Sequence, residues 1–282
     1  MNVTLAIVLA AALSASAASV CAGAFSWKDD ADDDDYSLGQ YIGVNAGNGF
    51  DAWILLEKGS TADGASYLAG QPFHPEQPAI EGASSWGMNG TQMVGRGLEQ
   101  PVPVGTWTFL AAHNVANIFD SGFSGFNLRS LKTSSDGLWL FTESELLRFG
   151  FNDDPYTGEQ GICYSLDPDS GYVYLGGRDW IGTTLEYSVS WQPSGGVTQY
   201  SLSVKNLDTG ETLEETIFAT SAHPPVEMLG TAIFGANNAE TITFDTYWVV
   251  PEPAAAVPVL AVVCLAAALC RRLRFVRVRL RR

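Results

Sequence analysis

The strongest constraint on the fold of this chain is a two-residue alternation of apolar and polar side chains. In residues 185–192, LEYSVSWQ, the odd positions are apolar or aromatic and the even positions are polar. Successive side chains of a β-strand point to opposite faces, so the pattern predicts a strand with one buried and one solvent-facing side. The expected core stripe consists of Leu185, Tyr187, Val189 and Trp191.

The same alternation continues on both sides of short turn sequences. PSGG ends the first stretch, QYSLSVKN alternates again, and NLDTGET leads into residues 213–218. This arrangement predicts three antiparallel strands in a meander over residues 183–218. Near the end of the body, TITFDTYW predicts that Ile242, Phe244, Thr246 and Trp248 share the core face of one strand.

Composition and spacing extend this prediction to the whole body of the chain. Of the 282 residues, 46% are hydrophobic and only 16% are charged, and glycine and proline are frequent. No stretch of the body has a convincing amphipathic helical pattern, whereas ten to thirteen short strand candidates lie between turn residues. We therefore predict an all-β domain over residues 41–249, an antiparallel β-sandwich of jelly-roll type.

The charge of the chain is unevenly distributed. All 31 acidic residues but only 8 of the 15 basic residues precede position 254, which gives this part a formal charge of −23. Such a surface repels phosphate backbones, so nucleic acid is excluded as an expected partner. Six aspartates occupy seven positions in residues 29–35. We expect residues 25–40 to be a solvated, disordered segment, with weak cation binding as the alternative.

The N-terminus has the features of a secretory signal peptide. A short apolar run at residues 5–13 is followed by small residues, and cleavage after Ala24 is favoured although no basic residue precedes the run. An uncleaved anchor and a lipoprotein attached through Cys21 are the alternatives. Three of the four cysteines lie in terminal apolar segments, so Cys163 is expected to be a free, buried side chain of the body.

The C-terminus combines three elements in a fixed order. Pro251, Glu252 and Pro253 form a stiff triplet, residues 254–270 are 17 positions without a charge, and residues 271–282 contain seven arginines. The uncharged run is just long enough for a transmembrane helix. Arg271, Arg272 and Arg274 would hold its end in the cytoplasm, which places the body outside and agrees with an export signal.

These three elements, over residues 250–282, resemble the PEP-CTERM sorting signal. The resemblance implies processing by an exosortase-type enzyme, transient membrane anchoring, and a Gram-negative host that makes extracellular polysaccharide. A rigid linker before an ordinary anchor is the alternative. The resemblance covers about the last 34 residues and does not extend to the body.

The body loosely resembles concanavalin-like lectin and glucanase domains, through an early SWGM segment and a final ITFDTYWVVPEP strand. Glucanases of that fold carry carboxylates that alternate along one strand. Glu143 and Glu145 are the nearest match here, although the full pattern is missing. The resemblance thus leaves a glycoside hydrolase or polysaccharide lyase as the alternative to a non-catalytic protein.

Other candidate sites in the body are weaker. Trp180 lies in a predicted loop, GGRDW, and is the best candidate for an exposed ring that stacks on sugar. Asp167 and Asp169 flank a proline before Ser-Gly, a pattern typical of a turn, with calcium binding as the alternative. The three histidines fit no catalytic or zinc motif, so no metal or other cofactor is expected.

The sequence therefore predicts an exported protein of the cell envelope or extracellular matrix. Its sandwich is expected to bind glycan or to pack among polymers without catalysing a reaction.

Overall fold

A computed structural model describes residues 26–36, 40–58, 65–70, 79–114, 122–130, 145–154, 157–166, 171–234 and 241–252. Within these residues, Trp27–Pro251 form one compact unit of fifteen β-strands and one short 3-10 helix, η1 (Asp34–Tyr36). The predicted signal peptide, residues 1–24, and the predicted span and arginine tail, residues 254–282, lie outside the described residues. Among the described residues, no helix is long and apolar enough to cross a membrane.

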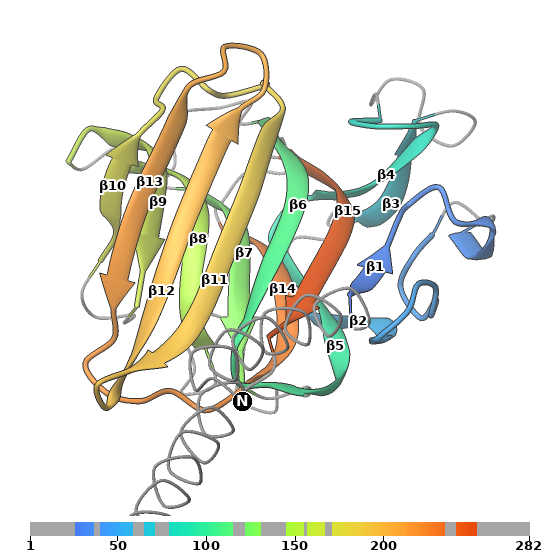
Figure 1. Ribbon diagram of the computed structural model, residues 1–282. Coiled ribbons are helices and arrows are strands. Elements are labelled where there is room, and N and C mark those ends of the chain that lie inside the picture. Colours follow the sequence, from blue (N-terminus) through green and yellow to red (C-terminus); the bar gives the residue numbers. More distant parts are fainter. Residues whose placement is uncertain are drawn as a thin grey trace, which may run out of the picture. The chain divides into compact units, whose positions relative to one another are not determined.

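The strands form two antiparallel sheets (Figure 1). Sheet A has the order β13 (Thr212–Phe218), β12 (Val197–Asn206), β11 (Leu185–Ser194), β6 (Gly105–Asn114), β15 (Thr241–Pro251), β4 (Ser84–Asn89) and β3 (Ala65–Gly70), and β1 (Trp27–Asp29) also pairs with β15. Sheet B has the order β10 (Val173–Gly176), β9 (Glu159–Ser165), β8 (Glu145–Asp154), β7 (Gly122–Arg129), β14 (Val226–Phe234), β5 (Gln92–Val102) and β2 (Phe50–Lys58). The predicted all-β antiparallel sandwich is confirmed.

The core between the sheets is rich in aromatic side chains. Trp107 of β6 contacts Tyr247 of β15 with ring centroids 5.0 Å apart, and Phe109 stacks on Tyr187 of β11 at 5.2 Å. Phe126 of β7 contacts Phe109 from the opposite sheet. Edge-to-face and offset contacts of this kind add to the free energy gained from burying the rings. The aromatic residues therefore hold the two sheets face to face.

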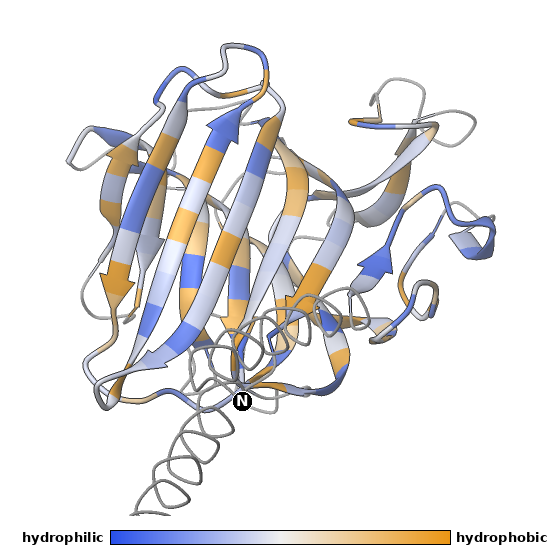
Figure 2. Ribbon diagram, in the orientation of Figure 1, coloured by the Kyte–Doolittle hydropathy of each residue, from blue (hydrophilic) through white to orange (hydrophobic). Residues whose placement is uncertain are grey.

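The predicted meander is confirmed as β11, β12 and β13. Its strands pair in register, and the four residues of the predicted stripe of β11 are all buried. Figure 2 shows the alternation as hydrophilic and hydrophobic bands along β11 and β12. Cys163 of β9 is a free, buried cysteine, as expected, and burial raises the pKa of its thiol well above the ordinary value.

The prediction for β15 is wrong in its second half. Ile242 and Phe244 are buried as expected, but Tyr247 and Val249 are buried next, while Trp248 is 50% exposed. The pairing of β15 with β6 shifts between Asp245 and Trp248, and Thr246 has a φ of 53°. A bulge adds one residue to one strand, and a slip of one residue moves every later side chain to the other face. The bulge therefore places Trp248 in solvent.

We predict that Thr246→Gly stabilises the protein by up to about 1 kcal/mol, because glycine adopts a positive φ without the cost that a β-carbon imposes. Chemical denaturation measures the change in the free energy of unfolding. Thr216→Gly, on the exposed face of β13 and with no positive φ, is the matched control and should destabilise by about 1 kcal/mol. Equal destabilisation by both changes would contradict the bulge geometry.

Candidate functional site

The acidic N-terminal segment is part of the sandwich, not a disordered tail. β1 pairs with β15, and Trp27 packs against Phe50. A β-carbon at Gly49, whose φ is +87°, would lie 1.9 Å from the Trp27 ring, so only glycine admits this contact. The interpretation of residues 25–40 as disordered is therefore wrong for residues 26–36, and the sandwich begins at Trp27, before the predicted boundary at position 41.

Asp29 explains why an acidic segment can pack. Its carboxylate forms an ion pair with Arg96 of β5 and accepts a hydrogen bond from the Tyr36 hydroxyl at 2.8 Å. Both charged side chains are fully buried. Arg96 also donates to the Tyr36 hydroxyl at 2.5 Å and to the Ala46 carbonyl, and its guanidinium lies over the rings of Phe50 and Trp53. We call Asp29, Tyr36, Trp53 and Arg96 the inter-sheet cluster, because β1 belongs to sheet A and β5 to sheet B.

Burial and charge oppose each other at Asp29. Removal from water raises the pKa of this carboxyl, while the Arg96 guanidinium lowers it, and the net pKa is about 6. The carboxylate is therefore ionised at pH 7 and paired with Arg96. A buried pair of this kind contributes little net stability, but the loss of one partner leaves an uncompensated charge in the core.

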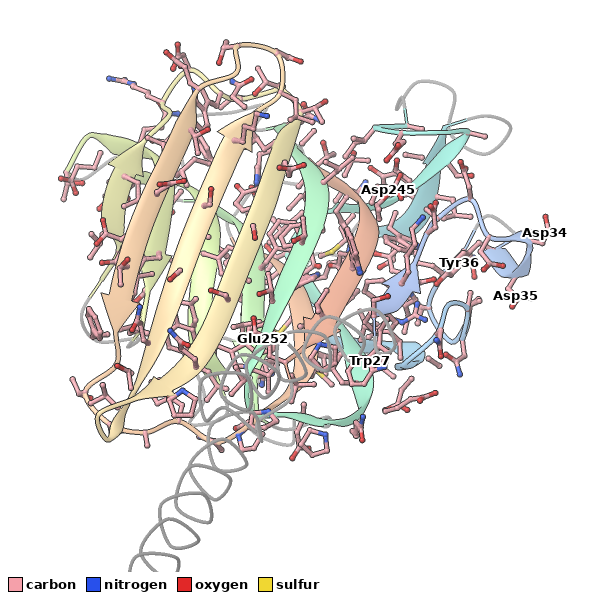
Figure 3. The ribbon with its side chains drawn as sticks, in the orientation of Figure 1. Trp27, Asp34, Asp35, Tyr36, Asp245 and Glu252 are labelled. Carbon is pink, nitrogen blue, oxygen red and sulfur yellow. The ribbon has the colours of Figure 1, made fainter. Side chains whose placement is uncertain are left out.

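Two further aspartates fasten the segment. Asp32 accepts hydrogen bonds from the backbone N–H groups of Ala83 and Ser84 at 3.0 and 2.7 Å. Asp245 of β15 accepts a hydrogen bond from the Ala31 N–H of the segment at 3.4 Å and from the Ser85 hydroxyl at 2.5 Å, and burial raises its pKa to about 7. Figure 3 shows Asp34 and Asp35 at the outer end of the segment, where both are exposed.

The predicted catalytic pair is not assembled in the described residues. Glu143 lies outside them, and Glu145 is the first residue of β8. Its side chain is buried, and Arg148 donates to Oε1 from Nε at 2.9 Å and to Oε2 from Nη2 at 2.8 Å. Asn127 of β7 also donates to Oε1, at 2.9 Å. Because both oxygens accept charge-assisted hydrogen bonds, Glu145 is not placed to transfer a proton or to attack a sugar.

Arg148 is the centre of a second buried cluster, on the face of sheet B that points away from the core. Its guanidinium lies 4.5 Å from the Phe234 ring centroid and 5.5 Å from that of Phe123, and Nη1 donates to the Tyr172 hydroxyl at 3.4 Å. Phe123 also stacks on Tyr172. The Arg148 guanidinium therefore has Glu145 as its counter-charge and two aromatic rings, Phe123 and Phe234, beside it. The cluster orders β7, β8 and the segment before β10.

Trp180 is not the exposed platform that its loop position suggested. Only 4% of the residue is exposed, and it belongs to the main core. The turn that contains it folds back, with the Trp180 N–H donating to the Gly177 carbonyl and the Thr183 hydroxyl donating to the Trp180 carbonyl. The prediction that Trp180 is an exposed ring is wrong.

His113 is buried between the sheets. Its Nδ1 lies 2.8 Å from the Ser124 hydroxyl and its Nε2 lies 2.8 Å from the Tyr187 hydroxyl. Burial lowers its pKa to about 3, so the ring is neutral at physiological pH. Each nitrogen has one hydroxyl partner, and solvent does not reach the site. The arrangement satisfies a polar group in the core and gives no access to a substrate.

Within the described ranges, no group of three or more His, Cys, Asp or Glu residues could hold a metal ion. The predicted turn with Asp167 and Asp169 lies outside them, and so do Pro253, Arg271, Arg272 and Arg274. Pro251 is the last residue of β15 and pairs with Gly105. Glu252 follows it and is exposed.

No protein-family model matches the chain, and no curated protein matches it in sequence. Among solved structures, a seed lectin of Lotus tetragonolobus is similar at 10% identity, with a TM-score of 0.45 over 69% of this chain and 95% of the lectin. Lectin II from Ulex europaeus has 10% identity and a TM-score of 0.44, over 70% and 96%. A legume lectin-like domain from Entamoeba histolytica has 11% identity and a TM-score of 0.41, over 64% and 95%. Likeness at this level does not assign a function.

We predict that Arg96→Met destabilises the protein by about 3–5 kcal/mol, because it leaves the Asp29 carboxylate buried without a counter-charge. Adding Asp29→Asn to this variant should recover part of the loss, since neither charge then remains. Urea unfolding measures each value. Lys28→Ala, which removes the exposed ion pair with Asp30, is the control and should cost less than about 1 kcal/mol. Additive losses in the double variant would contradict the coupling.

The pH dependence of the free energy of unfolding should reflect the lowered pKa of His113 in the folded protein. The unfolded chain binds a proton near pH 6.5 and the folded chain only near pH 3, so the contribution of the neutral ring is present above pH 6.5 and is lost as the pH falls towards 3. The slope is at most about 1.4 kcal/mol per pH unit. We expect the stability difference between wild type and His113→Gln to shrink as the pH falls from 7 to 4. A difference independent of pH would show that the ring titrates normally.

Proposed function

We propose that this protein is an exported, C-terminally sorted component of the cell envelope or extracellular matrix. In this proposal its β-sandwich, of jelly-roll and concanavalin-like type, binds glycan or packs among polymers without cleaving them. An exosortase-type enzyme would process the PEP-CTERM signal of residues 250–282 after transient anchoring through residues 254–270. The body would face the exterior throughout, and neither nucleic acid nor a metal is required.

One observation supports the sorting part most directly: the sandwich ends where the Pro-Glu-Pro triplet begins. β15 pairs with β6 up to Pro251, and Glu252 is exposed. An enzyme at the membrane surface could therefore reach Glu252 by opening no more than the last pair of β15, Pro251 with Gly105. Two prolines fix φ on either side of Glu252, which favours an extended backbone with a presented carboxylate.

The position of Glu145 favours a non-catalytic role over the hydrolase or lyase alternative. Retaining glycosidases need two carboxyl groups about 5 Å apart that are free to act as nucleophile and acid. The Glu145 carboxylate instead neutralises Arg148 in a buried cluster. Sugar release that is abolished by Glu145→Gln, in a variant that folds as wild type does, would restore the alternative.

Sorting is tested by deletion of residues 251–253 in the native host. We expect the wild-type chain to lose its C-terminal segment and the deletion variant to remain full-length in the membrane fraction. Immunoblotting of a tag inserted in the exposed turn after β11, at residues 195–196, follows both products. Glu211→Ala, at an exposed acidic position in the body, is the control and should be processed normally. Unchanged processing of the deletion variant would defeat the sorting proposal.

Glycan binding is tested with the same full-length protein in mild detergent. We expect it to sediment with insoluble neutral polysaccharides, microcrystalline cellulose or chitin, and to bind alginate less, since the body, with a formal charge of −23 before position 254, repels an anionic polymer. Binding to none of these polymers would overturn the glycan part of the proposal and leave the sorting part intact.

A further inference from the structure

The outer face of sheet A has an ordered array of hydroxyl groups. Thr216, Ser201, Ser190 and Thr106 are successive register partners across β13, β12, β11 and β6. In the neighbouring row, Ser203, Ser188 and Thr108 are partners across β12, β11 and β6. Register partners on adjacent strands point to the same side of a sheet. We call these seven residues the hydroxyl face; it lies on the sheet nearest the viewer in Figure 1.

The array belongs to the solvent side of the sheet. Along β11 and β12 the residues between these serines are buried core residues, whereas the serines themselves are partly exposed and Thr216 is exposed. Within the described part of the chain, none of the seven hydroxyls has a hydrogen-bond partner. The groups are therefore available to a ligand that exchanges hydrogen bonds through hydroxyls.

An exposed indole lies at one end of the array. Trp248 is the register partner of Thr108, and the bulge at Thr246 turns its side chain to the outer face. Phe218, 57% exposed, lies at the other end, on β13. Four strand spacings separate β15 from β13, which corresponds to about 19 Å. The hydroxyl face thus lies between two aromatic platforms.

We propose that the hydroxyl face, with Trp248 as its anchor, binds an extended neutral polysaccharide. The inference rests on the proposed glycan-binding function and assigns it to one face. An aromatic ring removes the apolar C–H face of a sugar ring from water, and serine and threonine hydroxyls exchange hydrogen bonds with sugar hydroxyls. The strands of the two platforms lie about 19 Å apart, and Phe218 lies four residues along β13 from Glu214 in the row of Trp248, so the platforms are separated by more than this spacing and suit a polymer better than a single sugar.

The chemistry of the face argues against the other occupants. Interfaces between protein copies are rich in aromatic and aliphatic side chains and poor in serine, whereas hydroxyls dominate here. A nucleic acid or an acidic glycan would meet a body with a formal charge of −23. The row of Thr108 ends at Glu214 on β13 and at Lys28, the register partner of Trp248, and Glu186 and Lys205 form the next pair along β11 and β12, so charges of both signs border the face. A neutral polymer therefore fits best.

The experiment compares sedimentation of full-length protein with cellulose and chitin after changes on this face. Trp248→Ala should weaken binding roughly tenfold or more, as expected for the loss of an aromatic anchor. Thr108→Val keeps the size and branching of the side chain but removes one hydroxyl, and should weaken binding about two- to tenfold. Leu55→Ala is the control, because it removes an exposed apolar side chain, 44% exposed, from sheet B.

The outcomes separate this inference from the proposed function. Binding by wild type that is unchanged in Trp248→Ala and Thr108→Val overturns the assignment of the face and leaves glycan binding intact. Loss of binding in Leu55→Ala as well would show a non-specific effect and would also overturn it. A change of oligomeric mass in Trp248→Ala without a change in polysaccharide binding would assign the face to a second copy of the chain. Failure of wild type to bind either polymer removes the proposed glycan binding and this inference together.

Discussion

The buried guanidinium of Arg96 is the constraint on which the rest of this sandwich depends. A charge removed from water in the core needs a counter-charge, and Asp29 supplies it from the N-terminal segment. The segment that supplies it also pairs with β15 as β1, buries Tyr36 beside the ion pair, and packs Trp27 over Gly49. An acidic sequence that looks like a solvated tail thus becomes the element that connects the two sheets.

Much of the fold follows from side-chain periodicity alone. The meander β11–β13 and its core stripe are predictable because regular strands keep a strict two-residue period. The exposure of Trp248 is not predictable in this way, because a bulge reverses the alternation before it. The bulge itself has no sequence signal, since Thr246 has a β-carbon and such residues rarely adopt a positive φ. The packing of residues 26–36 depends on Arg96, some sixty positions away. A basic residue in the otherwise apolar stretches QMVGRGL and LLRFGF is the one available signal that Arg96 and Arg148 have buried partners.

The same considerations separate structural charge from functional surface. Glu145 and Arg148 form a buried ion pair, as Asp29 and Arg96 do, and His113 is neutral and buried. What the molecule offers to solvent is an acidic body and a row of uncharged hydroxyls beside Trp248. Single serines on a strand carry no signal in the sequence. Their register across four strands, known only from the fold, makes them a surface. It is to this surface that we assign the proposed binding of a neutral polysaccharide.

Native-state hydrogen exchange of the full-length protein tests the central claim, that the acidic segment is an integral part of the sandwich. If it is, the backbone amides of Trp27–Asp29 exchange as slowly as those of their partners in β15, because both open only with the inter-sheet cluster. Exchange of these amides at the rate of an unstructured peptide, while β15 remains protected, would contradict the account.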